Sequence, residues 1–330
     1  MGRVDWIDRA NGIAWQFFVL CDVRVCNKEN EVCMAGKIVR AYLKGGLGNQ
    51  CFIYAAARAA VLRTGSELLL DGSYFKEDKV YRRSFSLDCF NYAGTKVADA
   101  SRAERMFRKV RYALLRDRRQ RLGNYCCDMR PFRYRPLPKD WCGTLVLDGY
   151  FQSERYFSDV REHILADFTL KDATWLESDP LANQIRTAEH SIFLHVRSYK
   201  EVPGKEDGRC AMWLVRYYRD ALLRLEGELP SGRVFVFSDD IEWARVNVLA
   251  GIEGKSRLEF VFNGAGSSQE RDFALMRLCR HGILADSSFS WWAGWLGEQE
   301  CMQKGVKSLR LHVDKYVLNA DFWPERWVAI

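Results

Sequence analysis

The stretch GILADSSFSWWAGWL, residues 282–296, combines a short apolar run, a hydroxyl-rich turn and three tryptophans within five positions. Its first four residues are predicted to form a strand, and a helix is expected to begin near Ser290, the expected N-cap. Ser287 and Ser288 lie in the turn between the two elements. Because a helix N-terminus attracts negative charge, these hydroxyls and the first N–H groups of the helix predict an anion site.

The three tryptophans come directly after this turn. Trp291 and Trp295 are four positions apart, so they are expected on one face of the helix, with Trp292 beside them. We interpret the three rings mainly as packing that holds the turn against a neighbouring strand. The alternative is that one of the rings stacks on a ligand.

Along the rest of the chain, short apolar runs alternate with segments of helical spacing. Such alternation is typical of α/β folds with mostly parallel sheets. The polar segment 175–190, which contains Pro180, is the expected break between two Rossmann-like halves, 34–185 and 186–330. The predicted strands are Ile38–Leu43, Glu67–Leu70, Leu145–Leu147, Ser191–Val196, Val234–Phe237, Leu258–Phe262 and Gly282–Ala285. The predicted helices are Asn49–Leu62, Met212–Leu225, Ile241–Leu249 and Glu270–His281.

Composition is that of an ordinary globular protein. The 330 residues are 48% hydrophobic, which allows a sizeable core, and the formal net charge is +7. That charge is compatible with an anionic ligand, a membrane surface or a plain basic surface. The eleven cysteines form no Cys-x2-Cys pair and only five histidines accompany them, which argues against a metal site and favours reduced thiols in the cytoplasm.

Residues 1–33 show little periodicity and differ in character from the rest of the chain. A regular pattern begins at Met34: a charged residue is followed by a short apolar strand and a glycine turn. Residues 1–33 are therefore expected to be an upstream extension or a loosely attached arm. The most apolar early stretch, Ile13–Cys21, is shorter than the roughly 20 residues that span a bilayer. No signal-peptide pattern surrounds it. We expect a soluble or peripheral protein.

Residues 101–122 form the most basic segment of the chain, with nine Arg or Lys residues against Glu104 and Asp117. Apolar residues recur at helical spacing, which predicts a basic amphipathic helix. The plain interpretation is a solvated surface helix. The alternative is peripheral contact with an anionic membrane or with a pyrophosphate-linked acceptor.

The segment YLKGGLGNQ, residues 42–50, places Gly45, Gly46 and Gly48 between a predicted strand and a predicted helix. Glycines at such a turn let backbone N–H groups approach a ligand. Cys51 stands where a dinucleotide fingerprint would have its third glycine, and the Gly-Lys-Ser/Thr of a P-loop is absent. By spacing alone the segment indicates a structural turn.

Several blocks in this order resemble family 11 glycosyltransferases, the α-1,2-fucosyltransferases. GGLGNQCFIYA is similar to the family's opening GGLGNQ-M-F-x-Y-A, and GYFQSERYF to G-Y-[FW]-Q-S-E-x-Y-F. HVR matches the start of H-x-R-R-G-D-Y, and FSDD with the adjoining IEW matches F-S-D-D-x-x-W. DFALMRLCRHGILADSSFSWWAGWL resembles a long and highly specific family block, and the ending PERWVAI is also similar. Together the blocks cover nearly everything from Met34 onward.

The resemblance implies a GT-B-like fold, with two Rossmann-like domains facing a cleft. It places the acceptor on the side of 34–185 and GDP-fucose in 186–330. It further implies transfer of L-fucose from GDP-β-L-fucose to the 2-hydroxyl of a galactosyl residue, with inversion and without a metal or other cofactor. The expected acceptor is a galactose-containing glycan of the surface-polysaccharide or O-antigen type, including a lipid-linked one, at the cytoplasmic face of the inner membrane. Nucleic acid is not an expected partner.

Donor binding is the function expected of the residues in these blocks. Arg197 ends a predicted strand, and its planar guanidinium suits a phosphate, so it is also the first catalytic candidate. Asp239 and Asp240 come after another strand; one is expected to accept from the guanine N–H groups and one to cap the next helix, in either order. The predicted donor-binding set is Gly46, Gly48, Asn49, Gln50, His195, Arg197, Ser238, Asp239, Asp240, Ser287, Ser288 and Phe289.

The chain departs from the family pattern after Arg197. Ser198 stands in place of the second arginine and Lys200 in place of the aspartate, so the base expected near the acceptor hydroxyl is unassigned. Glu201 and Asp207 are the nearby candidates for that base. Otherwise the leaving GDP takes the proton, and Lys200 restores positive charge. Asp286 replaces the usual Asn, which is harmless if it points away from the donor and weakens donor affinity if it points inward.

The sequence is also compatible with two alternative functions. One is an enzyme that transfers fucose to another position, or transfers another GDP-sugar. The other is a non-catalytic relative that binds GDP or a glycan, which the broken R-G-D-Y motif favours.

Overall fold

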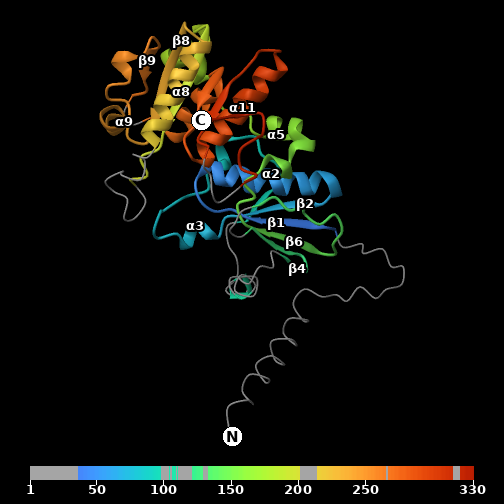
Figure 1. The fold of residues 1–330 in the computed structure, drawn as a ribbon. Helices are drawn as coiled ribbons and strands as arrows, with labels where there is room; N and C mark the ends of the chain where they lie inside the picture. Colours follow the sequence, from blue (N-terminus) through green and yellow to red (C-terminus); the bar gives the residue numbers. More distant parts are fainter. Residues whose placement is uncertain are drawn as a thin grey trace.

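The computed structural model describes residues 36–97, 121–128, 133–200, 214–264, 267–314 and 320–330, together with 104, 106–108 and 110. Two six-stranded sheets lie in sequence order along these residues. The predicted α/β class with mainly parallel sheets is confirmed. Figure 1 shows the first sheet, with β1, β2 and β6, separated from the second half of the chain by helix α2.

The first sheet has the strand order β3-β2-β1-β6-β5-β4. All neighbouring strands in it are parallel except β4 and β5, which pair antiparallel. Its central strand β1 reads IVRAY, and the alternation of half-buried and buried residues in it matches a sheet covered on one face by a helix. The strands are β1 Ile38–Tyr42, β2 Glu67–Asp71, β3 Thr95–Val97, β4 Arg121–Leu122, β5 Tyr125–Cys127 and β6 Thr144–Asp148.

The second sheet has the order β12-β11-β10-β7-β8-β9, and all its strands are parallel. Counted from β7, this is the order of a Rossmann sheet, in which the chain changes direction between the first and the fourth strand. Ligands bind such sheets at the carboxyl ends of those two strands, here β7 and β10. The strands are β7 His190–Val196, β8 Gly232–Ser238, β9 Glu259–Phe262, β10 His281–Ile283, β11 Arg310–His312 and β12 Val328–Ala329.

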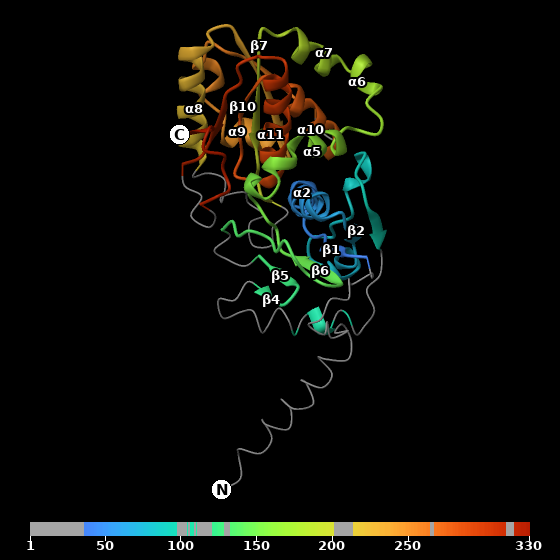
Figure 2. The ribbon, with the colours of Figure 1, turned by 90° about the vertical axis from the view of Figure 1, so that its right-hand side faces the viewer.

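The helices alternate with these strands, as the sequence predicts for its long elements. Figures 1 and 2 show α8 and α9 on one side of the second sheet, and α10 and α11 between that sheet and α2. The α-helices are α2 Leu47–Thr64, α3 Tyr74–Glu77, α5 Arg161–Asp167, α6 Trp175–Ser178, α7 Pro180–Thr187, α8 Val215–Glu228, α9 Ile241–Asn247, α10 Gln269–Leu278 and α11 Ser288–Gln303. Short 3-10 helices are Leu87–Cys89, Glu154–Tyr156, Ser158–Val160 and Glu253–Lys255.

Two predictions about local structure need correction, and the expected boundary segment contains helices. The segment 175–190, expected as a break, contains α6 and α7, and Asp179 caps α7 through the N–H groups of Leu181 and Ala182. Arg121–Leu122, expected at the end of a basic helix, is strand β4. Helix α11 begins at Ser288, earlier than predicted, because Ser287 is its N-cap.

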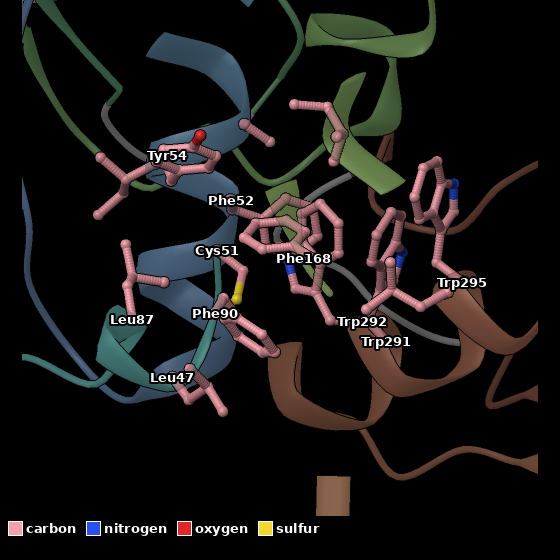
Figure 3. Packing of buried hydrophobic residues seen from close by; sticks show 14 of the residues in the cluster. Leu47, Cys51, Phe52, Tyr54, Leu87, Phe90, Phe168, Trp291, Trp292 and Trp295 are labelled. Carbon is pink, nitrogen blue, oxygen red and sulfur yellow. The ribbon is translucent and has the colours of Figure 1, made fainter. Parts of the chain in front are cut away.

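The core between the two sheets is built from α2 and α11. Trp291, Trp292 and Trp295 are fully buried. Figure 3 shows these rings facing Phe52 of α2 and Phe168. Trp291 and Trp295 stack on each other at 6.1 Å, as their shared face predicts. The interpretation of the tryptophans as packing is therefore confirmed, although they pack on α2 rather than on a neighbouring strand, and their burial excludes stacking on a ligand.

Candidate active site

A cavity of about 740 Å³ lies at the carboxyl ends of β7, β8 and β10, where the strand order of the second sheet changes direction. The N-termini of α2 and α11 both contribute residues to its wall. All of the residues predicted to bind the donor line it, with the exception of Gln50. The sequence blocks, which lie up to about 240 positions apart, therefore meet in one place.

The start of α2 forms one wall of the cavity through Gly46, Gly48 and Asn49. Gly45 precedes it with a φ of +76°, a left-handed conformation that favours glycine. A Cβ on Gly48 would lie 2.3 Å from the carbonyl carbon of Ser288, so the glycine serves the close approach of α2 to α11 as well as the cavity. Asn49 is oriented by Gln152, whose amide nitrogen donates to its side-chain oxygen at 2.9 Å.

Gln50 does not line the cavity, which corrects the prediction of a donor contact. Its side chain is fully buried, and its amide nitrogen donates to the carbonyl oxygens of Gly45 and Ser84 at 2.9 and 2.8 Å. Its amide oxygen accepts the N–H of Ser86 at 2.8 Å. The residue therefore fixes the glycine turn against the segment around 84–86.

His195 and Arg197 extend the end of β7 into the cavity. Burial, followed by the charge of Arg197, lowers the pKa of His195 to about 4. The imidazole is therefore neutral at physiological pH. Its ring lies 5.5 Å from that of Phe289, which also lines the cavity.

Asp239, at the end of β8, holds the segment that comes after β7. One of its carboxylate oxygens accepts the N–H of Ser198 at 2.7 Å and the other accepts the Ser198 hydroxyl at 2.9 Å. The guanidinium of Arg197 lies 3.3 Å from the same carboxylate. Asp239 therefore orients the arginine within the cavity.

Asp240 is the helix cap that the sequence predicted for one of the two aspartates. Its carboxylate accepts the N–H of Trp243 at 2.9 Å at the start of α9. The other oxygen contacts the ammonium of Lys200 at 2.5 Å, and this contact, followed by the helix N–H, lowers the pKa of Asp240. Lys200 thus shares its charge with Asp240 rather than lining the cavity. The hydroxyl of Ser238 accepts the Asp240 N–H at 3.1 Å.

The start of α11 forms the wall next to that of α2, which it approaches at Gly48. The hydroxyl of Ser287 accepts the N–H of Ser290 at 3.1 Å, which leaves its proton available to a ligand. The predicted cap, Ser290, instead accepts the N–H of Ala285 at 3.0 Å and is fully buried. Ser288 and Phe289, the first residues of the helix, line the cavity beside Ser287.

These elements give the cavity the properties of an anion site. The first N–H groups of a helix have no carbonyl partner within it, and the helix dipole adds partial positive charge there. Two helices, α2 and α11, begin at this cavity, and Arg197 adds a full charge. The arrangement suits a diphosphate better than a single helix would.

The structure also brings residues into the cavity that the sequence did not assign to donor binding, among them Arg83, Gln152, Tyr199, Asp272 and Asp286. Gln152 and Asp272 lie in blocks that carry the family resemblance, and this membership is the sequence signal that indicates them. Tyr199 and Asp286 occupy positions where the chain departs from the family pattern. No sequence pattern indicates Arg83, because it lies in the irregular segment between α3 and β3.

Some predicted features lie outside the described residues. Glu201 and Asp207, the candidate bases, belong to this group, as does most of the basic segment 101–122. Within the described part of that segment, Arg108 lies 3.0 Å from the carboxylate of Asp148. In the described chain, no group of three or more His, Cys, Asp and Glu side chains could hold a metal ion. None of the helices described is long and apolar enough to cross a membrane.

Comparison with solved structures finds fucosyltransferases. NodZ α-1,6-fucosyltransferase soaked with GDP-fucose matches with a TM-score of 0.48 and 18% identity, over 79% of this chain and 92% of that one. A variant of Arabidopsis thaliana FUT1 in complex with GDP matches with a TM-score of 0.49 and 13% identity, over 96% of this chain and 79% of that one.

Relatives found by sequence are more similar to the chain, with identities of 27–32%. An α-1,2-colitosyltransferase of Escherichia coli is 29% identical, over 89% of this chain and 99% of its own length. The O-antigen biosynthesis glycosyltransferase WbnK of Escherichia coli is 27% identical, over 87% and 94%. A galactoside α-(1,2)-fucosyltransferase 1 of Saimiri boliviensis boliviensis is 32% identical, over 46% and 43%. The family model for glycosyl transferase family 11 matches residues 105–309, and the chain belongs to this family.

Proposed function

We propose that this glycosyltransferase moves L-fucose from GDP-β-L-fucose to the 2-hydroxyl of a galactosyl residue, with inversion at the anomeric carbon. The observation that carries the proposal is the cavity at the carboxyl ends of β7 and β10, where two helix N-termini and Arg197 converge. A family 11 enzyme needs such a site for the diphosphate of a nucleotide sugar. The α-1,2 linkage in the names of two relatives supports the acceptor position.

The chemical difficulty in this reaction is the charge that the leaving GDP gains as the glycosidic bond breaks. Groups already in place for that charge lower the barrier because they need no rearrangement during the reaction. Arg197, held by Asp239, and the N–H groups and hydroxyls at Ser287 and Ser288 are such groups. In this proposal they neutralise the diphosphate and no metal ion takes part.

The guanine end of the donor belongs, in this proposal, near Asp239 and Asp240. Asp239 is occupied by Ser198 and Arg197, whereas Asp240, which caps α9 and contacts Lys200, keeps lone pairs for the guanine N–H groups. The neutral imidazole of His195 packs beside Phe289 and completes the donor wall.

We place the acceptor on the other side of the cavity, in a GT-B arrangement. The first sheet, within 34–185, forms the acceptor domain and the second sheet, within 186–330, forms the donor domain. Gly46, Asn49, Arg83 and Gln152 extend from the first half into the cavity and support this division. Glu201 or Asp207 takes the proton of the acceptor hydroxyl, or the leaving GDP does so.

The acceptor that we propose is a galactose-containing glycan of the O-antigen type, because a relative that covers most of the chain is named for O-antigen biosynthesis. In this proposal the acceptor is linked to a lipid, and the protein works in the cytoplasm and touches the inner membrane through the basic segment 101–122. A second candidate donor is GDP-colitose, which the colitosyltransferase relative favours.

The test incubates the full chain with GDP-fucose, GDP-colitose or GDP-mannose and a panel of β-galactosides, with and without EDTA. We expect a fucosylated product, identified by mass and by linkage analysis as α-1,2, and unchanged rates after chelation. Consumption of GDP-colitose alone would replace the donor. Loss of activity in EDTA that is restored by a divalent cation would overturn the metal-free mechanism.

A further inference from the structure

Asp286 lies between the end of β10 and Ser287, the N-cap of α11, and lines the cavity. One of its carboxylate oxygens is buried and has no hydrogen-bond partner among the described residues. Buried polar atoms are almost always paired, so an unpaired one within a ligand cavity is a candidate for a ligand contact. The residue lies directly beside the hydroxyls that form the anion site.

Aromatic hydroxyls bind the backbone at and around Asp286. The Tyr199 hydroxyl donates to the backbone oxygen of Asp286. The hydroxyls of Tyr217 and Tyr218, on α8, donate to the backbone oxygens of Leu284 and His195. Asp286 shares the cavity lining with the titratable and charged groups of His195, Arg197, Tyr199 and Asp239. Burial, followed by the charge of Asp286, raises the pKa of Tyr218 on α8, and burial raises the pKa of Tyr217 beside it, with a smaller contribution from Asp286.

Burial alone raises the pKa of Asp286 to about 7, and no cation in the described part of the chain counteracts the effect. The carboxyl group is therefore poised between its two forms near neutral pH. A carboxylate beside a diphosphate would be repelled, whereas a neutral carboxylic acid could donate its O–H to a phosphate oxygen. An occupied donor site thus favours the protonated form.

We propose that Asp286 is a donor-binding residue that takes up a proton when the GDP-sugar enters, and donates a hydrogen bond to the diphosphate as a neutral acid. The inference rests on the proposed function, because it needs a nucleoside diphosphate in this cavity. The proton comes from solvent, no covalent bond changes, and the proton returns to solvent when GDP leaves.

The sign of the resulting pH dependence is set by linkage. Because the bound state holds the proton more tightly than the free state, donor affinity is greatest below the pKa of free Asp286 and falls as pH rises above it. One proton gives at most a tenfold loss of affinity per pH unit. His195 is neutral over this pH range in the free protein, because burial and the charge of Arg197 lower its pKa to about 4.

The experiment is isothermal titration of the full chain with GDP-fucose, without acceptor, at pH 6, 7 and 8. Each titration is repeated in two buffers of different ionisation enthalpy, so that the number of protons taken up is measured directly. GDP-fucose is the better probe than GDP, because a terminal phosphate has its own ionisation near pH 6. We expect uptake approaching one proton at pH 8, and about tenfold weaker binding at pH 8 than at pH 6.

Asp286→Asn keeps the shape of the side chain and supplies an amide donor that does not titrate. In this variant we expect no proton uptake, equal affinity at all three pH values, and tighter binding than the wild type at pH 8. Asp272→Asn is the matched control, because burial also raises the pKa of this cavity carboxyl group. Its proton uptake is expected to match that of the wild type, whatever its affinity.

The outcomes separate the two proposals. Tight binding with pH-independent affinity, or proton uptake that persists in Asp286→Asn, would overturn the role of Asp286 and leave the proposed function intact. Loss of uptake in Asp272→Asn alone would assign the proton to Asp272 and overturn the inference. No binding of GDP-fucose at any pH by a folded protein would overturn both.

Discussion

At the scale of single residues, the cavity depends on side chains that hold one another in position. Arg197 projects from the end of β7, and the carboxylate that orients it, Asp239, lies just after the neighbouring strand β8. Asp239 also binds the backbone and hydroxyl of Ser198, so the segment stays attached if the arginine is removed. Arg197 can therefore be tested without unfolding its surroundings.

Arg197→Ala is expected to lower kcat/KM by about 100- to 1000-fold, the usual cost of removing one group that stabilises transition-state charge. The melting temperature should stay near that of the wild type. Arg216→Ala, on the exposed face of α8, is the matched control and should change kcat/KM less than twofold. Steady-state kinetics with thermal melts checks both, and near-wild-type rates for Arg197→Ala would remove the residue from the site.

Tyr199 has a φ of +59°, a left-handed conformation that costs a non-glycine residue about 1–2 kcal/mol. Tyr199→Gly and Tyr199→Ala both lose the hydroxyl contact to Asp286, and only the glycine variant is free of the strain. We expect Tyr199→Gly to unfold with a free energy about 1 kcal/mol higher than Tyr199→Ala. Urea denaturation measures the difference, and equal stabilities would show that the backbone there is unstrained.

Side chains at strand ends were the most predictable part of the candidate site. Arg197 is predicted from the carboxyl end of its strand, Ser287 from the start of the following helix and His195 from the family resemblance, and all three line the cavity. Gln50 was misjudged, because its sequence neighbours line the cavity while its own side chain points into the protein. Arg83 was missed because a loop position carries no periodicity that would place it.

At the scale of elements, the donor site exists only if α2 and α11 start close together. The missing side chain of Gly48 allows the contact with the backbone of Ser288. Gly48→Ala is expected to destabilise the protein by about 1–3 kcal/mol and to weaken donor binding, because α11 must move. Gly227→Ala, at an exposed position of α8 with nothing within 4 Å of the added methyl group, should instead stabilise the protein by about 0.5–1 kcal/mol.

Chemical denaturation and titration with GDP-fucose test this pair of variants. Their opposite signs separate the contact between the two helices from ordinary helix propensity, which favours alanine at both positions. Unchanged donor affinity in Gly48→Ala would show that the start of α11 does not contact the donor.

Elements with long apolar or periodic segments could be predicted from the sequence, and short ones could not. β1, β7 and β8 are predictable because five to seven mostly apolar residues follow one another in each. β4 and β12 have two residues each, too few to show an alternating pattern. The polar face of α7 resembles a segment between domains and hides the helix, although Asp179 followed by Pro180 is a recognisable helix start.

The buried side chain of Arg310 shows why tertiary contacts escape such reasoning. It extends from β11 and donates to the backbone oxygens of Gly294 at 2.8 Å and of Arg280 at 2.7 Å. These carbonyl groups lie in α11 and just after α10. No local pattern marks a strand arginine whose side chain binds backbone oxygens of α11 and of a residue after α10. An arginine in a strand is normally expected at the surface.

At the scale of the whole molecule, one continuous apolar cluster joins the two sheets. It contains Val39 of β1, Phe193 of β7 and Phe235 of β8, with the tryptophans of α11 between them. A shared core ties the stability of each half to the other. We therefore expect the two halves to unfold together, as one calorimetric transition.

A substitution at Trp292 tests whether the two halves unfold together. Its ring is fully buried, stacks on Phe157 at 5.2 Å and lies 5.0 Å from Phe168 and 5.1 Å from Phe52. Trp292→Ala should lower the free energy of unfolding by about 3–5 kcal/mol. Met302→Ala, at an exposed position of the same helix, should change it by less than about 0.5 kcal/mol.

Differential scanning calorimetry, read beside tryptophan fluorescence, gives the decisive comparison. In Trp292→Ala the single transition should move to lower temperature as a whole, because both halves lose the same packing partner. A transition that splits, with one part unmoved, would show that the sheets fold independently and that the shared cluster adds little. Since the cavity walls come from the starts of α2 and α11, which this core holds together, the same variant should also weaken GDP-fucose binding, although Trp292 itself does not line the site.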